Sequence, residues 1–473
     1  MNLTAVLIPI YLAAVIAIVV ISGRKSKTFK DYALADGKLP WFVLTGTIIA
    51  SLIGGGTMMG YVGSFYTYGV LYFWMFIALF AAQIVMAYFI AARVRRLKVY
   101  SIADIFSKRY GKAARLISGI INMIVGIAVG FAMLSSFSTL LSGYVGIDKN
   151  WAMIIGVLLF AITATLGGFK GVAITDAIQA VLIIGGALVV SVTAFQKSGG
   201  LAGWSALPSD MLSLTAPTLP FLTFAGSVIS AFGMGLADQA VMFQRINAAK
   251  SPKDANRATR TAAWLALLCF LLIAAMGISA RIILPEGLAG NDVIVELLKT
   301  VSPAVGALYS AAIIAAVLTT ANSMYLSASM SFSHDLLKAV FPKISDKAQV
   351  IAGKLFVWIA AVISYFVIKF QPSIMTWIML GYACITCMII PLYGGLLSKK
   401  ATPASGALSL GLSIIGVVVW EFLKSPFGIN SVFVALILGI LGFVAGFGIK
   451  AGVKQEQIEM VDQFKSKVKA TDD

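Results

Sequence analysis

Apolar stretches of about 20 residues recur from one end of this chain to the other. A helix of that length crosses a hydrocarbon core of about 30 Å, so each stretch is long enough to span a membrane. Hydrophobic residues make up 60% of the 473-residue sequence and charged residues 12%, whereas soluble domains average about half and about a quarter. We therefore expect an all-α polytopic membrane protein.

The hydropathy pattern predicts thirteen membrane-spanning helices, and an odd number places the two termini on opposite sides of the membrane. Cytoplasmic loops carry an excess of Lys and Arg. The loops on one face, with the tail from residue 450, hold 30 of the 36 basic residues. We therefore expect a multi-pass protein of the plasma (cell) membrane with its N-terminus outside and its C-terminus in the cytoplasm. The predicted spans are 3–22, 40–66, 70–92, 116–142, 151–167, 174–195, 222–245, 262–283, 300–332, 353–370, 373–396, 404–424 and 430–449.

Two of the predicted spans are interrupted by glycines near their middle. Gly54–Gly56 lie in the second span and Gly233–Gly235 in the seventh, and each glycine costs a helix about 1 kcal/mol relative to alanine. Broken helices at matching positions of two halves are typical of transporters built from inverted repeats, with the binding site at the breaks. Close packing of helices through small residues is the alternative interpretation.

This pattern divides the chain into five parts. Residues 40–195 and 222–396 are expected to form two inverted repeats of five helices each. Residues 1–39 supply an extra first transmembrane helix and a cytoplasmic loop, 404–449 two C-terminal transmembrane helices, and 450–473 a cytoplasmic tail.

The ninth span carries a column of side-chain oxygens. Thr319, Asn322 and Ser323 share one helix face, and Ala316 lies one turn earlier. Carbonyl and hydroxyl oxygens bind sodium, and a helix broken by glycines offers free carbonyls. The pattern therefore indicates a sodium site between this span and the broken second span. Hydroxyls that bond back to the preceding turn, or that join neighbouring helices, are the alternative.

Two carboxylates lie within predicted spans, where an uncompensated charge is costly. Asp176 begins the sixth span near the predicted cytoplasmic face, where the helix dipole favours a carboxylate. Asp238 lies deeper, beside the glycine break of the seventh span. We expect Asp238 to face the central cavity and to favour a solute with a cationic group, unless Arg245, about two turns further on, neutralises it.

Other classes of function are disfavoured by the sequence. The net charge of +17 comes from short loops between spans, so no nucleic-acid binding is expected. Cys269, Cys384 and Cys387 fall inside apolar segments, and the single histidine, His334, builds no metal site. The sequence contains no Walker A, Gly-x-Ser-x-Gly or His-Glu-x-x-His motif. We therefore expect no enzymatic activity and no cofactor, with Na⁺ as the coupling ion.

One segment resembles the signature of a known family. Gly167–Phe169, followed by Asp176 and Gln179, is similar to the signature of the sodium:solute symporter family, and Thr319–Thr320 and Ser333–Leu336 also fit that family. The resemblance extends over essentially the whole chain. It implies a LeuT-like fold of two inverted five-helix repeats with broken helices, and transport of a small organic solute coupled to sodium.

The resemblance also implies which residues bind sodium. The backbone carbonyls of Ala50 and Ile53 in the broken second span, and of Ala316 in the ninth, match ligands of the family's sodium site. The hydroxyls of Thr319 and Thr320 complete the match.

Some members of this family hold a second sodium ion near the aspartate of the signature. The resemblance assigns that ion, or a gating role, to Asp176, with Thr319, Asn322 and Ser323 as its neighbours. Asn322 stands where a hydroxyl residue is expected, which argues against the second ion.

The solute is expected to bind at the same breaks, with Gly54, Thr57, Asp238 and Gln239 as site residues. The residues around these breaks look nearest to the choline-transporter-like branch. However, Leu52 and Gln239 replace the tryptophans that stack on choline in that branch, and this removes the attraction between a cation and an aromatic ring. Choline is therefore not the expected solute.

These observations together predict sodium-coupled symport of a small organic solute by alternating access. Proton-coupled uptake of a similar solute is one alternative, and a transporter-derived channel or sensor is another. The expected partners are the solute and the lipid bilayer. The oligomeric state and the identity of the solute are not predicted.

Overall fold

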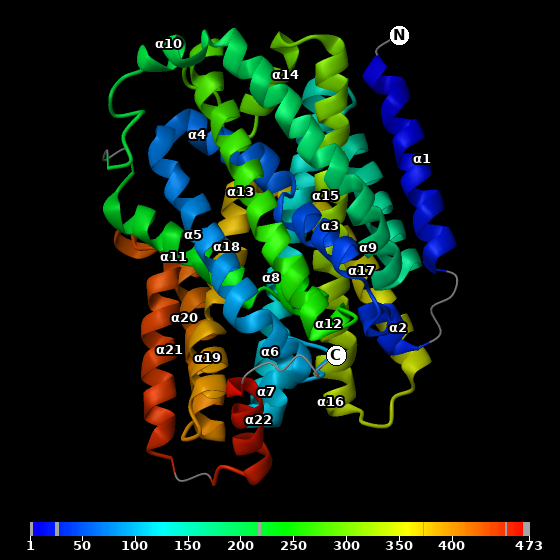
Figure 1. Ribbon diagram of the computed structural model, residues 1–473, viewed down its shortest axis with the longest axis vertical. Helices are drawn as coiled ribbons and strands as arrows, with labels where there is room; N and C mark the ends of the chain where they lie inside the picture. The colour runs from blue at the N-terminus through cyan, green and yellow to red at the C-terminus, as the bar shows by residue number, and fades with distance from the viewer. Residues whose placement is uncertain (1–2, 24–27, 216–218, 372, 450–451, 467–473) are drawn as a thin grey trace.

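The computed structural model describes residues 3–23, 28–215, 219–371, 373–449 and 452–466. Within these ranges every named element is a helix, apart from a single bridge between Leu39 and Ala249. Figure 1 shows the long helices gathered side by side in one bundle, with short helices at its two ends. The predicted all-α architecture is therefore confirmed.

The helices differ widely in length. In chain order they are α1 Leu3–Gly23, α2 Phe29–Leu34, α3 Trp41–Leu52, η2 Gly56–Tyr61, α4 Val62–Tyr68, α5 Phe73–Val85, η4 Met86–Ile90, α6 Ala91–Arg96, α7 Ile102–Tyr110, α8 Lys112–Leu140, η5 Leu141–Val145, α9 Lys149–Lys197, α10 Gly200–Ser205, α11 Phe221–Ala237, η6 Gln239–Phe243, α12 Gln244–Ala248, α13 Pro252–Ile283, α14 Val293–Thr300, α15 Pro303–Met330, η7 Ser331–Leu337, α16 Lys338–Val340, α17 Asp346–Phe370, α18 Ile374–Thr386, α19 Ile389–Leu397, α20 Pro403–Phe422, α21 Ser431–Phe447 and α22 Gln455–Lys465, with short 3-10 turns at Ala35–Gly37, Gly69–Tyr72 and Pro426–Gly428.

Nine helical stretches in the described ranges are long and apolar enough to cross a membrane. Two of these contain 41 and 49 residues, Gly56–Arg96 and Lys149–Lys197, and about 20 residues suffice for one crossing. Three shorter apolar helices, Pro9–Ile18, Trp41–Leu52 and Ser431–Phe447, accompany them. The count of thirteen crossings stays a prediction, as does the division into two inverted repeats.

The helical path is broken at glycine-rich segments. α9 changes direction at Gly168, whose φ of 54° lies in the region that only glycine adopts readily. α3 ends at Leu52, and Ile53 leaves the helical region (φ −93°, ψ 60°) before η2 begins at Gly56. α11 ends at Ala237, and Asp238 is extended (φ −67°, ψ 114°). The breaks therefore fall within the predicted second and seventh spans.

The glycines of the first break also allow close packing. A Cβ atom at Gly54 would lie 2.3 Å from the Oγ1 atom of Thr320 on α15, and one at Gly56 would lie 1.9 Å from Cδ1 of Ile378 on α18. A side chain at either position would push the neighbouring helix away. Helix breaking and close packing, which are alternatives on sequence alone, therefore both apply here.

α15 lies at the centre of the bundle. It packs against α8, α9 and α3, and nearly all its residues after the first turn are buried. α20 and α21 stand together at one edge of the bundle, whereas α1 packs on α9 at the other edge (Figure 1). α6, α7, α16 and α22 lie at one end, opposite α10 and α14 (Figure 1). The broken α3 and the central α15 thus meet deep inside the protein.

Candidate sodium and solute site

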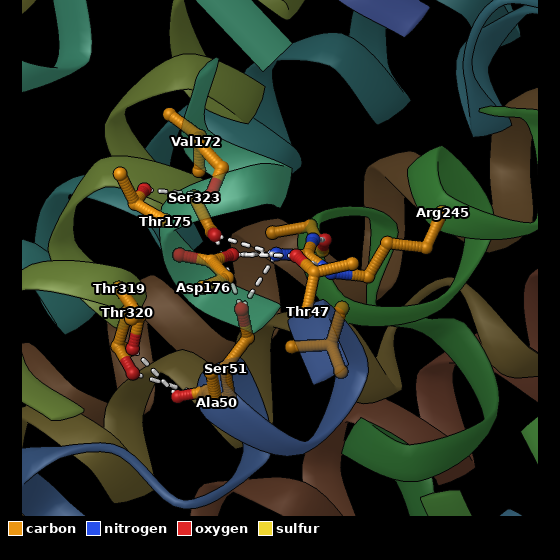
Figure 2. A network of polar contacts seen from close by, with 12 residues as sticks. Thr47, Ala50, Ser51, Val172, Thr175, Asp176, Arg245, Thr319, Thr320 and Ser323 are labelled. Atoms are coloured by element: carbon orange, nitrogen blue, oxygen red, sulfur yellow. Dashed lines mark hydrogen bonds and ion pairs between the residues drawn. The ribbon is translucent and has the colours of Figure 1, made fainter. Parts of the chain in front are cut away.

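The hydroxyl of Thr319 faces the end of α3. Its Oγ1 atom lies 2.6 Å from the carbonyl oxygen of Ala50 and 3.0 Å from that of Ala316, one turn earlier on α15. All three residues are fully buried. Three of the oxygens assigned to sodium are therefore brought within contact of one another by two different helices (Figure 2).

The neighbouring threonine completes the same arrangement. The Oγ1 atom of Thr320 lies 3.3 Å from the carbonyl oxygen of Ser51, and this hydroxyl packs directly over Gly54. Ile53 follows on the non-helical segment and is fully buried. The site is dry and rich in oxygen, and no charged side chain takes part in these contacts. Such a cluster suits a small, hard monovalent cation.

A second polar network lies beside this cluster (Figure 2). The Nη2 atom of Arg245 is 2.5 Å from Ser51 Oγ, 2.6 Å from Ser323 Oγ and 3.3 Å from Asp176 Oδ2. Thr47 links the two charges, because its hydroxyl donates to Asp176 Oδ2 at 2.5 Å and accepts from Arg245 Nε at 3.1 Å. The structure therefore pairs Arg245 with Asp176.

Asn322 points to a different neighbour. Its Oδ1 atom accepts a hydrogen bond of 2.7 Å from the hydroxyl of Thr163 on α9. Asn322 therefore joins α15 to α9, while Ser323 on the next position takes part in the Arg245 network. Of the residues predicted for a second ion, Asp176 and Ser323 are brought together, and Asn322 bonds elsewhere.

Asp238 and Gln239 lie away from the central cavity described below. The Oδ1 atom of Asp238 accepts hydrogen bonds from the backbone N–H groups of Ala240 and Val241, at 2.7 and 3.3 Å, and so caps the helix after the break. The Oε1 atom of Gln239 accepts from the N–H of Ile102 at the start of α7. The expectations that Asp238 faces the cavity and that Arg245 is its partner are therefore wrong for this structure, because helix capping satisfies the carboxylate.

Gly54 and Thr57 do line a central cavity, of about 30 Å³. That volume has room for one or two water molecules. Thr320 lines the cavity as well, so the cavity adjoins the candidate sodium site. Every side chain on its wall is uncharged; the lining residues are Ser51, Leu52, Gly54, Gly56, Thr57, Val129, Met133, Met234, Thr320, Met324, Ile378 and Tyr382.

A larger cavity of about 420 Å³ lies further along η2 and α4. Its wall includes Gly60, Gly63 and Met375, together with polar residues such as Ser64 and Gln371. A Cβ atom at Gly60 would lie 2.7 Å from the sulfur of Met375. α18 therefore packs tightly on η2 between the two cavities, with glycines on one side of the contact and apolar side chains on the other.

The opposite end of the bundle is closed by an ionic cluster. Arg115 on α8 lies 3.3 Å from Asp104 on α7 and 3.8 Å from Asp335 on η7. The Nε2 atom of His334 lies 3.4 Å from Asp104, and Ser101 donates to Asp335 at 2.8 Å. Burial alone would raise the pKa of Asp104, but its bond with His334 and the charge of Arg115 bring that pKa below its ordinary value.

Sequence reasoning missed several residues of this region. Ser51 and Thr47 bond to Arg245, yet each reads as one more small polar residue in an apolar span. Tyr382 and Met133 enter the cavity wall from α18 and α8. Ser51 could have been found from its position next to Ala50, but the other three carry no signal in the sequence, because distant helices bring them in.

The sodium:solute symporter family matches residues 32–416 of this chain, which is most of its length. This chain belongs to the sodium:solute symporter family. The resemblance inferred from the signature segment is confirmed.

Relatives of this family member are cotransporters and symporters, not enzymes. Sodium/myo-inositol cotransporter 2 of Oryctolagus cuniculus is 26% identical over 416 residues, covering 75% of this chain and 59% of that protein. The sodium/glucose cotransporter of Vibrio parahaemolyticus is 25% identical over 429 residues, covering 82% of this chain and 74% of that protein. The chain therefore spans about three-fifths of the length of the myo-inositol relative.

Solved structures share the fold of this family member. The substrate-bound, outward-open structure of a Na⁺-coupled sialic acid symporter has a TM-score of 0.82 at 22% identity, covering 96% of this chain and 99% of that chain. MhsT in complex with L-phenylalanine has a TM-score of 0.53 at 17% identity, covering 84% and 98%. At these identities the likeness shows the fold alone, and it agrees with the predicted LeuT-like architecture.

Proposed function

We propose that this protein is a symporter that moves a small organic solute together with sodium. One observation carries the proposal: at the break of α3, the hydroxyls of Thr319 and Thr320 face the carbonyl oxygens of Ala50 and Ser51. A helix that ends inside the bundle leaves carbonyls without amide partners, and a cation can satisfy them. Membership of the sodium:solute symporter family supports sodium as that cation.

The sodium gradient is sufficient for uphill transport. Moving one positive charge through about 100 mV releases about 2.3 kcal/mol. A tenfold sodium gradient adds about 1.4 kcal/mol. Together these terms support roughly 500-fold accumulation of a neutral solute when one sodium ion enters with it.

The two ends of the bundle suggest how access alternates. A cavity of about 420 Å³ lies on one side of the contact between α18 and η2, and the central cavity lies on the other side. On the remaining path, Arg115 holds α7, α8 and η7 together through Asp104 and Asp335. In this proposal the solute enters past α18, and release requires the ionic cluster to open.

The proposed solute is small, polar and without a net positive charge. The central cavity offers hydroxyls from Ser51, Thr57, Thr320 and Tyr382 and no side-chain carboxylate to compensate a cation. Relatives named for myo-inositol, glucose and proline are consistent with small polar organic solutes. We further propose the plasma membrane as the location, with the N-terminus outside.

The test begins with a thermal-shift screen of small polyols, sugars, amino acids and monocarboxylates, each with and without sodium. A solute of this transporter should raise the melting temperature further when sodium is present, because each ligand stabilises the folded state that binds it. Uptake of that solute into proteoliposomes is then measured with sodium replaced by potassium at constant pH. Loss of uptake supports the proposal. Uptake that follows a proton gradient instead, or that never exceeds equilibrium, would replace it with proton coupling or a channel.

A further inference from the structure

The side chain of Arg245 occupies the space beside the candidate sodium site. It is fully buried, and its guanidinium extends from α12 to contact α3, α9 and α15 at once (Figure 2). Its Nη2 atom reaches the hydroxyls of Ser51 and Ser323, and its Nη1 atom donates to the carbonyl of Ala240. The face of Phe169 covers the group, 5.6 Å from ring centre to guanidinium carbon.

The charges of this network already balance. Asp176 is fully buried and lies 3.3 Å from Arg245, so one carboxylate neutralises one guanidinium. A second cation bound to Asp176 would place two positive charges against one negative charge in a region shielded from water. Like charges at such short range repel strongly when the surroundings are poorly polarisable.

The oxygens that a second sodium ion would need are also engaged. The hydroxyls of Ser51 and Ser323 lie 3.1 Å apart and both accept from Arg245. Asn322 accepts from Thr163 on the far side of α15. Within the described residues, the Oδ1 atom of Asp176 is left without a hydrogen-bond partner. A single carboxylate oxygen does not make a sodium site, which requires several oxygens at contact distance.

We propose that Arg245 is a built-in cation that takes the place of a second sodium ion, so that each transport cycle is coupled to one sodium. This inference rests on the proposed function and fixes its coupling ratio. In it, the sodium at Thr319 and Thr320 is the ion that is exchanged. The guanidinium is the fixed charge that holds α3, α9 and α15 together on the other side of Ser51.

The experiment counts sodium ions bound per chain. The purified full-length protein, in lipid nanodiscs, is titrated with radioactive sodium alone, so that no solute needs to be known. We expect one ion per chain in the wild type and in Arg245→Lys, which keeps the charge. Arg245→Gln removes the charge and frees Asp176, Ser51 and Ser323, and we expect it to bind two ions. Arg109→Gln is the matched control, because Arg109 is another buried arginine, bonded to the carbonyls of Gly395 and Ser398, and should leave the count at one.

Each outcome decides a different claim. Two ions in the wild type would overturn the inference directly, even if Arg245→Gln failed to fold. One ion in both the wild type and a folded Arg245→Gln would show that the arginine is not what excludes the second ion. No sodium bound to the wild type would instead defeat the sodium site of the proposed function.

Discussion

Replacing Thr319 with alanine removes one side-chain oxygen from the proposed sodium site and leaves the helices in place. The lost Oγ1 atom lies 2.6 Å from the Ala50 carbonyl and 3.0 Å from that of Ala316, so a sodium ion bound there would lose one of its few ligands. A polar contact to a charged group contributes about 1.5–3 kcal/mol. That loss corresponds to a rise in the sodium concentration for half-saturation of roughly 10- to 150-fold.

The assay is a sodium titration followed by thermal shift or by radioactive sodium binding. Thr319→Ser keeps the hydroxyl and should stay close to the wild type. Thr165→Ala controls for the loss of a buried methyl group and hydroxyl, because Thr165 on α9 is buried and bonds back to the carbonyl of Ala161. Both alanine variants should lose similar stability without sodium, about 1 kcal/mol. Unchanged half-saturation in a folded Thr319→Ala would refute the assignment.

Three further changes test other parts of the structure. Gly54→Ala puts a Cβ atom 2.3 Å from a threonine hydroxyl of the sodium site and should weaken sodium binding at least about tenfold, whereas Gly185→Ala, which meets nothing within 4 Å, should not. Asp238→Asn removes the charge from a helix cap and should reduce competition by amine and acid analogues of the solute equally; a loss confined to amines would contradict the capping role. Asp104→Asn should lower the melting temperature at pH 7 by about 2–4 °C, since it weakens the contact with Arg115. Because the folded-state pKa of Asp104 is lowered, that contribution is complete above about pH 4 and is lost as pH falls through the folded value; a difference that persists undiminished at pH 3 would speak against it.

The sequence by itself determined the membrane architecture, because apolar length and the absence of alternative hydrogen-bond partners in lipid leave helices as the outcome. It also located the breaks at Gly54–Gly56 and Gly233–Gly235, since glycine weakens a helix wherever it stands. The facing of Thr319 and Thr320 toward the first break followed from helical periodicity together with the family signature. These are local or one-dimensional properties, and local chemistry is written in the order of residues.

The tertiary structure alone decided which charges meet. Arg245 is seven residues from Asp238 and 69 from Asp176, yet it pairs with Asp176, because α12 turns toward α9 after the break. Asp238 looked like a solute ligand because a deep carboxylate needs compensation, but two backbone N–H groups supply it at the start of η6. The central cavity likewise draws Met133 and Tyr382 from helices far apart in sequence. Partner choice in a buried site depends on how helices pack in three dimensions, and a sequence pattern records only which side chains are available.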